Sequence, residues 1–317
     1  MTRSTPDCRH PTDTADPSSS DLQVGQYLLT EVRHCEKTSG EPYMRLVLDD
    51  AQRSTVGFLW AEHMHQAWPL TVPAVVQITG RPVGRGEDAA LSISTLQFLH
   101  PASIDTGIQL LPIRFCPKLA LQAFASLMHW ERTWPVALRR FVGQVLVDPE
   151  IGIPFLRTRA AGRYHHAYRG GLLQHSAELL DLVPALVRRL MPDCPHAVAV
   201  TQVAALFHDL GKIHTVGQGD GQRPVLPPDW AERTHEALSL KMLTPHLKAL
   251  SAFCPETASV LFEVFTYLSQ PHATRGHARS LVIDIVRFID QMSTALDRGI
   301  GYWPSANHAK QVDQGCD

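Results

Sequence analysis

Histidine and aspartate stand side by side in the segment ALFHDLGK, at the end of a strongly apolar stretch. Neighbouring side chains on a helix diverge by about 100°, so His208 and Asp209 can both reach one ion placed between them. Imidazole and carboxylate together suit Mn, Fe, Co, Ni or Zn, and with water ligands also Mg. Lys212 follows on the same helical side, where its ammonium can neutralise a phosphate oxygen. Taken alone, the motif also fits a solvated helix end with Gly211 as its C-terminal cap.

Two further apolar segments each contribute one ligand-type side chain. In HHAYRGGLLQHSAEL, His175 lies one turn inside a predicted helix that begins at Gly170 and Gly171. Backbone N–H groups at a glycine-containing helix start can approach an anion closely. In IVRFIDQMSTALD, Asp290 is a carboxylate in an otherwise apolar helix. Because a buried polar side chain costs free energy unless it has a partner, these two residues and the His-Asp pair together indicate a metal site with two nitrogen and two oxygen ligands.

The periodicity of apolar residues changes once along the chain. From residue 21 to about residue 100, five short runs alternate apolar and polar side chains, with one or two helical turns expected after the third run. That order is typical of a small Greek-key barrel of the OB type, although alternation alone also fits another small barrel or a sandwich. After Pro112, seven segments have apolar residues at spacings of three and four, which predicts helices. Pro245 is expected to break or kink one of them.

We therefore predict an α+β protein of two domains. The OB-type β-barrel, expected to bind nucleic acid, spans residues 21–100, and the helical domain spans 101–302; the polar segments 1–20 and 303–317 are predicted to be flexible tails. Six scattered cysteines without a C-x-x-C pair suit a reducing cytosol. No signal-like segment or membrane-length apolar run is present, so we expect a cytoplasmic protein with no membrane partner.

The order H…HD-x-GK…D within predicted helices resembles the HD superfamily of metal-dependent phosphohydrolases. The longer segment HHAYRGGLLQHSAEL is similar to two of its branches, the OB-plus-HD 3′→5′ exoribonucleases of the YhaM type and the HD domains of TraI/MobH-type conjugative relaxases. The segment SGEPYMRLVLDDAQRSTVGFLWA is similar to the OB domain of the first branch. The resemblance thus covers about residues 21–300 and favours that branch.

This resemblance implies four metal ligands: His175, His208, Asp209 and Asp290. Asp209 would be able to bridge two ions, and His235 in RTHEAL matches a further ligand to the second ion. The family's S-H-H-G run is replaced here by SQPHATRG, which leaves His272 as the candidate in that position. We expect Mn²⁺, with Mg²⁺, Co²⁺, Ni²⁺ and Fe²⁺ as alternatives, and one or two ions per site.

The chemistry that the resemblance implies is hydrolysis of a phosphoester by a metal-activated water. We expect Asp209, Lys212 and His166 to be the catalytic side chains, with the lysine neutralising phosphate charge and the histidine moving a proton. The leading prediction is a 3′→5′ exonuclease that acts on single-stranded RNA or DNA.

Substrate contacts are expected around the glycine turn and on the barrel. The candidate substrate-binding residues are His165, Arg169, Gly170, Gly171, Tyr43 and Trp60. The aromatic rings of such barrels can stack on bases, although alternation predicts that some of them belong to the core. Residues 21–100 contain six Lys or Arg against nine Asp or Glu, and this acidic balance is unfavourable for binding a nucleic acid.

Three other functions fit parts of the sequence. A phosphohydrolase acting on nucleotides would use the same helical motifs, with the barrel serving for homo-oligomerisation or for binding a partner. A non-catalytic nucleic-acid-binding accessory protein of a mobile element would explain the altered SQPHA segment but not the complete HDLGK motif. A di-iron oxygenase would need a fuller histidine shell than these motifs provide.

Overall fold

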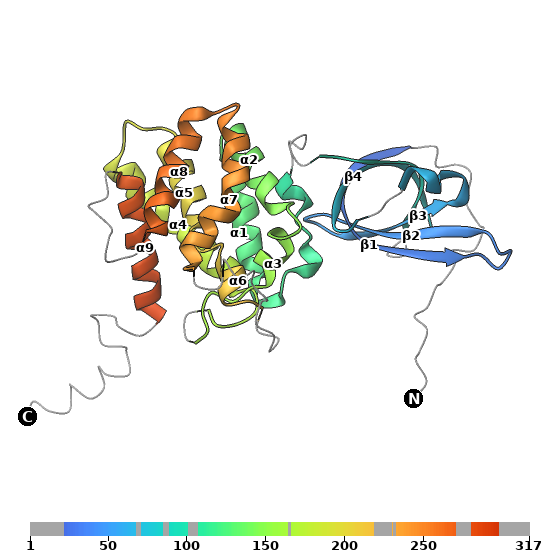
Figure 1. Ribbon diagram of the computed structural model, residues 1–317, viewed down its shortest axis with the longest axis horizontal. Coiled ribbons are helices and arrows are strands. Elements are labelled where there is room, and N and C mark those ends of the chain that lie inside the picture. Colours follow the sequence, from blue (N-terminus) through green and yellow to red (C-terminus); the bar gives the residue numbers. More distant parts are fainter. Residues whose placement is uncertain are drawn as a thin grey trace, which may run out of the picture.

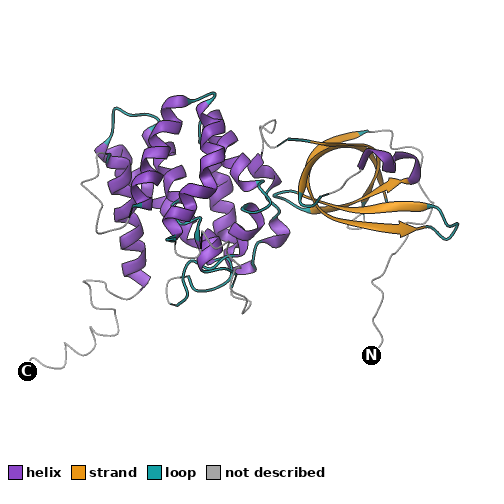
Figure 2. Cartoon of the chain, in the orientation of Figure 1, coloured by secondary structure: helices purple, strands orange, loops and turns teal. Residues whose placement is uncertain are grey.

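The computed structural model describes residues 22–67, 71–84, 89–100, 107–163, 166–218, 230, 233–270 and 280–297. A β-barrel comes first along the chain and a helical part follows it, as Figures 1 and 2 show. The coarse prediction of a small barrel followed by helices is confirmed. Among the described residues, none of the helices combines the length and the apolar character needed to cross a bilayer.

Five strands close the barrel, in agreement with the five predicted runs. They are β1 (Gln23–Glu36), β2 (Pro42–Asp49), β3 (Ser54–Trp60), β4 (Ala74–Val83) and β5 (Ala90–Phe98). The order around the barrel is β1-β2-β3-β5-β4, and every neighbouring pair is antiparallel except β3 and β5, which run parallel. The short 3₁₀ helix η1 (Ala61–Ala67) follows β3, where a helical turn was predicted.

Alternation along each strand divides the barrel into an inside and an outside. On β2, Met44, Leu46 and Leu48 belong to the apolar core of the barrel, together with side chains from the other four strands. The intervening residues of β2 face the other way, because successive strand side chains point to opposite sides of a sheet. The pairing register of the strands is thus determined by the burial of one apolar face of each strand.

The helical part begins with three short 3₁₀ turns, η4 (Gly107–Leu110), η5 (Ile113–Phe115) and η6 (Lys118–Ala120). It continues with α1 (Leu121–Glu131), α2 (Val136–Leu146), α3 (Gly152–Arg157), α4 (Gly171–Leu190), α5 (Ala197–Phe207), α6 (Lys212–Thr215), α7 (His235–Ser251), α8 (Pro255–Ser269) and α9 (Leu281–Asp297). The described residues of this part contain no strand, as predicted. Pro245 lies inside α7, which continues to Ser251, so the expected break of this helix is wrong.

One large apolar cluster unites the helices around α4 and α5. In it, the ring of Phe207 meets Phe141 and Phe155 edge to face, with ring centroids 6.1 Å and 6.5 Å away. Complete burial of one such side chain contributes roughly 1.5–3 kcal/mol. Helices α4, α5 and α9 pack against one another in pairs, which brings residues distant in sequence to one place.

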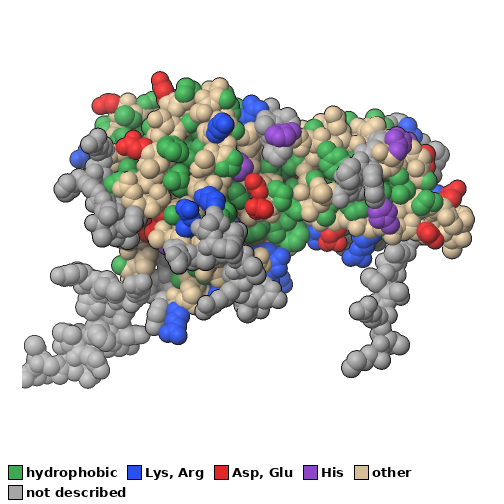
Figure 3. Space-filling view, viewed as in Figure 1, with side chains coloured by type: hydrophobic (Ala, Val, Ile, Leu, Met, Phe, Trp, Pro, Cys, Tyr) green, Lys and Arg blue, Asp and Glu red, His purple; other side chains and the backbone are tan. Residues whose placement is uncertain are grey.

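A buried carboxylate ties the barrel to the helical part. Asp49 at the end of β2 is fully buried, and the Nε of Arg114, from the η5 turn, lies 2.7 Å from its Oδ2. A second nitrogen of the same guanidinium lies 3.0 Å from Oε1 of Glu31 on β1. The backbone N–H of Ala51 also donates to the carbonyl of Gln109 at 2.8 Å. A small apolar cluster spans the same junction: Leu28, Val75, Leu110 and Val147. Figure 3 shows hydrophobic side chains at the surface where the two parts meet.

Candidate metal centre

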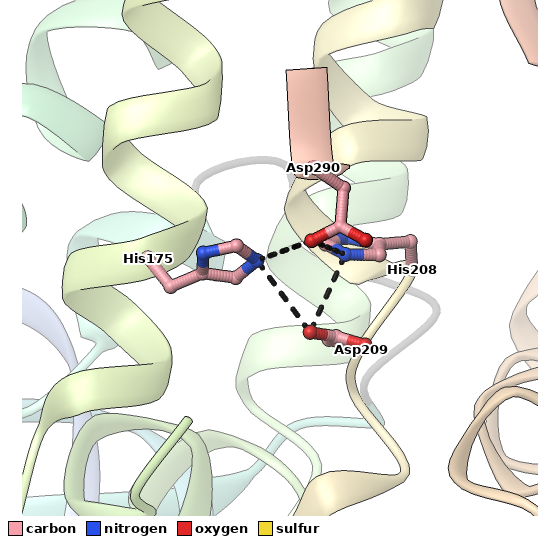
Figure 4. Close-up of side chains that lie close together, drawn as sticks. All are labelled: His175, His208, Asp209 and Asp290. Carbon is pink, nitrogen blue, oxygen red and sulfur yellow. Dashed lines mark ion pairs between the residues drawn. The ribbon is translucent and has the colours of Figure 1, made fainter. Parts of the chain in front are cut away.

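The four predicted ligands come together at one point in the helical part. His175 lies on α4, His208 and Asp209 follow the end of α5, and Asp290 lies on α9 (Figure 4). One ligand atom from each residue lies within 4.8 Å of those of the other three. Nε2 of His175 is 3.5 Å from Oδ2 of Asp209 and 3.2 Å from Oδ1 of Asp290, and Nε2 of His208 is 3.3 Å and 3.5 Å from the same two oxygens.

The side chain of His208 is oriented as a metal ligand requires. Its Nδ1 lies 2.8 Å from the carbonyl oxygen of Ala205, so Nδ1 carries the proton and donates, and Nε2 is directed at the two carboxylates. Nε2 is buried and makes no geometrically acceptable hydrogen bond to any residue that the structure describes. An ion placed between the four donors would satisfy this buried ring nitrogen. The cluster of two imidazoles and two carboxylates could therefore hold a metal ion.

The charges of the cluster hold one another in their ionised forms. Burial favours the neutral imidazole of His208, but the carboxylates of Asp209 and Asp290 outweigh burial and raise the pKa of His208 to about 9. Burial also favours the protonated form of Asp209, yet His208 and Lys212 beside it keep the pKa of that carboxyl well below its usual range. The pKa of Asp290 is likewise lowered, against burial, by contacts with both imidazoles. The imidazole of His208 and the two carboxylates thus favour opposite charges on one another.

Asp209 has different partners on its two oxygens. Lys212 on α6 contacts Oδ2, the oxygen that also faces the imidazoles of the cluster. His235, the first residue of α7, places its Nε2 3.1 Å from Oδ1 and its Nδ1 3.5 Å from Oε2 of Glu236. Lys212 and His235, which the sequence analysis linked to Asp209, therefore both lie beside its carboxylate. His235 contacts Oδ1, the oxygen that does not face the other three residues of the cluster.

Gly211 allows close packing at this turn. The prediction that it is the C-terminal cap of the preceding helix is wrong, because the C-cap of α5 is His208. The φ of Gly211 is −62°, and this residue is the N-cap of α6. A Cβ at this position would lie 2.0 Å from the carbonyl oxygen of His235, so only glycine lets the HDLG turn approach α7 this closely. Its N–H donates to Oγ of Ser239 at 2.8 Å, and the same hydroxyl lies 3.0 Å from the carbonyl oxygens of His208 and His235. The sequence analysis did not identify Ser239 as part of the site. It could have been found from its position one helical turn after His235.

His166 lies next to the cluster in a strained backbone conformation. Its φ of 47° is positive, which is rare for a residue other than glycine and occurs often at functional sites. Its Nε2 lies 2.9 Å from Oε2 of Glu178 and its Nδ1 3.2 Å from the hydroxyl of Tyr168, and its ring centroid is 6.2 Å from that of His175. Glu178 was not singled out from the sequence, although it lies three residues after His175 on the same helix.

The carboxyl of Glu178 is held ionised beside this histidine. Burial raises the pKa of Glu178, but the contacts with His166 and with the amide of Gln174 are stronger, and the net result is a lowered pKa. An ionised carboxylate accepts a hydrogen bond from the imidazole N–H and so fixes the orientation of the His166 ring.

The glycine turn does not form the expected anion cradle. Gly170 has a φ of 90° and is the N-cap of α4, but its N–H and the next two already have carbonyl partners, on Arg157, Tyr168 and Thr158. The reason for Gly171 is steric, because a Cβ there would lie 1.9 Å from the carbonyl oxygen of His166. Arg169 at this turn is exposed, and the expectation that it binds substrate stays a prediction.

The two aromatic candidates on the barrel differ in exposure. Tyr43 is only 2% exposed and packs against Phe58 and Trp60, with ring centroids 6.0 Å and 5.5 Å away, so the expectation that Tyr43 stacks on a base is wrong for this structure. Trp60 is half-buried; its indole N–H donates to Oγ of Ser92 at 2.8 Å, and Nζ of Lys37 lies 4.7 Å from its ring centroid. Trp60 keeps part of its surface accessible.

Some predicted features lie outside the described residues. They are His165, His272 and the two terminal segments 1–20 and 303–317. A scan against protein-family models and a search of curated proteins both found no match to this chain. The interpretation of the metal centre therefore rests on its own residues and geometry.

Proposed function

We propose that this protein is a metal-dependent phosphohydrolase of the HD type. The observation that carries the proposal is the convergence of four buried donors from three separate elements, with Lys212 against one of them. Two imidazoles and two carboxylates suit Mn²⁺ best in our proposal, with Mg²⁺, Co²⁺, Ni²⁺ and Fe²⁺ as alternatives. When bound, such an ion supplies a Lewis acid that activates water near neutral pH and neutralises charge on a phosphate.

The chain's own residues would contribute three further effects. The ammonium of Lys212 would move from Asp209 to a phosphate oxygen of the substrate and stabilise the charge that develops there. Asp209, with separate partners on its two oxygens, would serve as the bridging ligand if a second ion binds beside His235. His166, held by Glu178, would give or accept a proton at a defined ring nitrogen.

Single-stranded nucleic acid is the substrate that we favour. The strand order β1-β2-β3-β5-β4, closed into a barrel with β3 and β5 parallel, supports an OB-type barrel, and that architecture commonly binds oligonucleotides. Together with the helical metal centre, it supports a 3′→5′ exonuclease acting on RNA or DNA.

Nucleotides are a second candidate substrate, and two observations on the barrel favour them. Residues 21–100 carry more acidic than basic side chains, and Tyr43 offers no exposed ring face. A barrel with these properties would serve for homo-oligomerisation or for binding a partner, while the helical part alone would bind the small substrate.

Degradation of a 5′-labelled single-stranded RNA in the presence of Mn²⁺ tests the proposal, with a parallel panel of nucleotides. Wild type, Asp209→Asn and His196→Ala should be compared. His196 serves as the control because it is exposed and lies at the opposite end of α5 from His208. Shortening from the 3′ end that is absent in Asp209→Asn supports the exonuclease. Release of phosphate from nucleotides alone supports the second candidate, and neither activity in metal-loaded protein contradicts both.

A further inference from the structure

A small cavity adjoins the metal centre on the side of α7, α8 and α9. Its volume is about 90 Å³, far below the roughly 300–1,000 Å³ of pockets that enclose a whole small molecule. It is lined by three residues of the centre (His208, Asp209 and Asp290) and by His235, Glu236, Leu268, Val286, Arg287 and Gln291. A cavity of this size accommodates one compact charged group beside the metal ligands and leaves the rest of a substrate outside.

Arg287 is the arginine in this lining. It lies three residues before Asp290 on α9, which places the two side chains on the same face of the helix. Its side chain is half-buried; Nη1 lies 3.5 Å from the hydroxyl of Tyr267 on α8, and the guanidinium carbon lies 5.9 Å from the centroid of the same ring. Within the part of the chain that the structure describes, no carboxylate lies within ion-pair distance of this guanidinium.

Lys212, a second cation beside the centre, is already engaged. The ammonium of Lys212 contacts Oδ2 of Asp209, so its charge is compensated by a ligand of the cluster. Glu236, the acidic residue at the cavity that is not part of the cluster, lies next to the imidazole of His235. Arg287 thus presents a positive charge at the cavity that no carboxylate among the described residues pairs with. A planar guanidinium forms two parallel hydrogen bonds to phosphate, and contact with an aromatic residue restricts its orientation.

We propose that Arg287 binds the phosphate of the substrate at the metal centre, with Tyr267 orienting its guanidinium. This inference rests on the proposed phosphohydrolase function and adds a residue, three positions before Asp290, to which the sequence analysis gave no role. The substrate class is a phosphate ester whose anionic group enters the cavity between α7 and α9.

The direct test is calorimetric titration of inorganic phosphate into protein that has been loaded with Mn²⁺ and freed of excess metal. We expect Arg287→Gln to bind phosphate about tenfold or more weakly than wild type, Arg287→Lys to be intermediate, and Tyr267→Phe to lose a smaller factor. Arg189→Gln, which removes an exposed arginine from α4, is the control and should bind like wild type. Metal content must be equal in all variants, which separates loss of phosphate binding from damage to the metal centre.

Kinetics on a cleaved substrate provide the second readout. Arg287→Gln should raise KM by a similar factor and change kcat less, because the contact is present in the bound ground state. Unchanged phosphate affinity and KM in Arg287→Gln overturn the inference while the phosphohydrolase function stands, and a metal-loaded wild type that does not bind phosphate also overturns it. If wild type binds phosphate through Arg287 but cleaves no phosphate ester, the anion site stands and the proposed function fails.

Discussion

Nε2 of His235 lies 3.1 Å from Oδ1 of Asp209, on the carboxylate oxygen that does not face the four-residue cluster. The other oxygen, Oδ2, lies 3.5 Å from Nε2 of His175 and 3.3 Å from Nε2 of His208. One carboxylate therefore faces two groups of nitrogen donors. This arrangement would let Asp209 be shared between two ions if a second ion binds beside His235.

The number of bound ions can be tested by substituting His235 and Asp209 separately. We expect wild-type protein to retain two Mn²⁺ ions, His235→Ala to retain one, and Asp209→Asn to retain none, because the aspartate contacts both groups of donors. Removing the histidine should weaken binding of the second ion by more than the roughly 10–100-fold that loss of an outer-shell partner costs. Metal analysis after loading and desalting measures this, with His196→Ala as the control. Equal metal content in wild type and His235→Ala would show that the centre holds a single ion or that His235 is no ligand.

Gly211→Ala should damage the centre without removing any ligand. The added methyl would lie 2.0 Å from the carbonyl oxygen of His235, so α7 or the HDLG turn must move. We expect a loss of about 1–3 kcal/mol in the free energy of unfolding, the usual cost of overpacking, together with weaker metal retention. Gly162→Ala is the matched control, because a Cβ there meets no atom within 4 Å. Urea unfolding and metal analysis check both effects, and similar results for the two variants would contradict the packing argument.

The ligand set and the order of the elements could be predicted because each depends on local pattern. His175 lies on a helix whose apolar spacing already marks the buried face, so its burial follows from its phase. The HDLG segment follows a helix that is apolar on all sides, and such a helix ends in the interior of a domain. The alternation of apolar and polar side chains likewise allowed the five barrel strands to be predicted. These features need no knowledge of distant residues.

Features that depend on pairs distant in sequence could not be predicted. The contact of His166 with Glu178 exists because a strained turn brings residues twelve apart together, and nothing in the local pattern specifies that turn. Tyr43 alternates as an outward-facing residue of β2, but Phe58 and Trp60 of the next strand cover it. Gly211 has the sequence context of a helix cap, whereas its actual constraint is the approach of α7.

The junction between barrel and helices depends on Arg114. Asp49 is fully buried, so truncating its partner leaves an uncompensated charge, and breaking a buried pair typically costs about 3–5 kcal/mol. Because Arg114 is itself about one-third exposed, we expect Arg114→Ala to lower the free energy of unfolding by about 2–3 kcal/mol. Arg33→Ala removes a surface contact with Glu31 at 3.5 Å and should change stability by less than about 1 kcal/mol. Equal losses in the two variants, measured by urea unfolding, would contradict a special role for the buried pair.

Asp148 makes part of the stability of the helical part depend on pH. Burial raises the pKa of Asp148, but the contact with His246 on α7, whose Nε2 lies 3.3 Å from Oδ2, and the backbone N–H of Glu150 outweigh it, and the pKa is lowered. A carboxyl with a lowered pKa in the folded state stabilises the fold fully above its unfolded pKa of about 3.9. That contribution is lost as the pH falls through the folded pKa, because the unfolded chain takes up the proton first.

Comparing Asp148→Asn with wild type isolates this contribution. The difference in their free energies of unfolding should have its full value above about pH 5 and should shrink as the pH is lowered below about 4. Asp193→Asn is the control, since Asp193 is exposed and has no ion pair with any residue the structure describes. Urea unfolding at a series of pH values measures the difference for both variants. A difference for Asp148→Asn that is constant with pH would mean that the neutral carboxyl packs as well as the ionised one, and that His246 does not stabilise its charge.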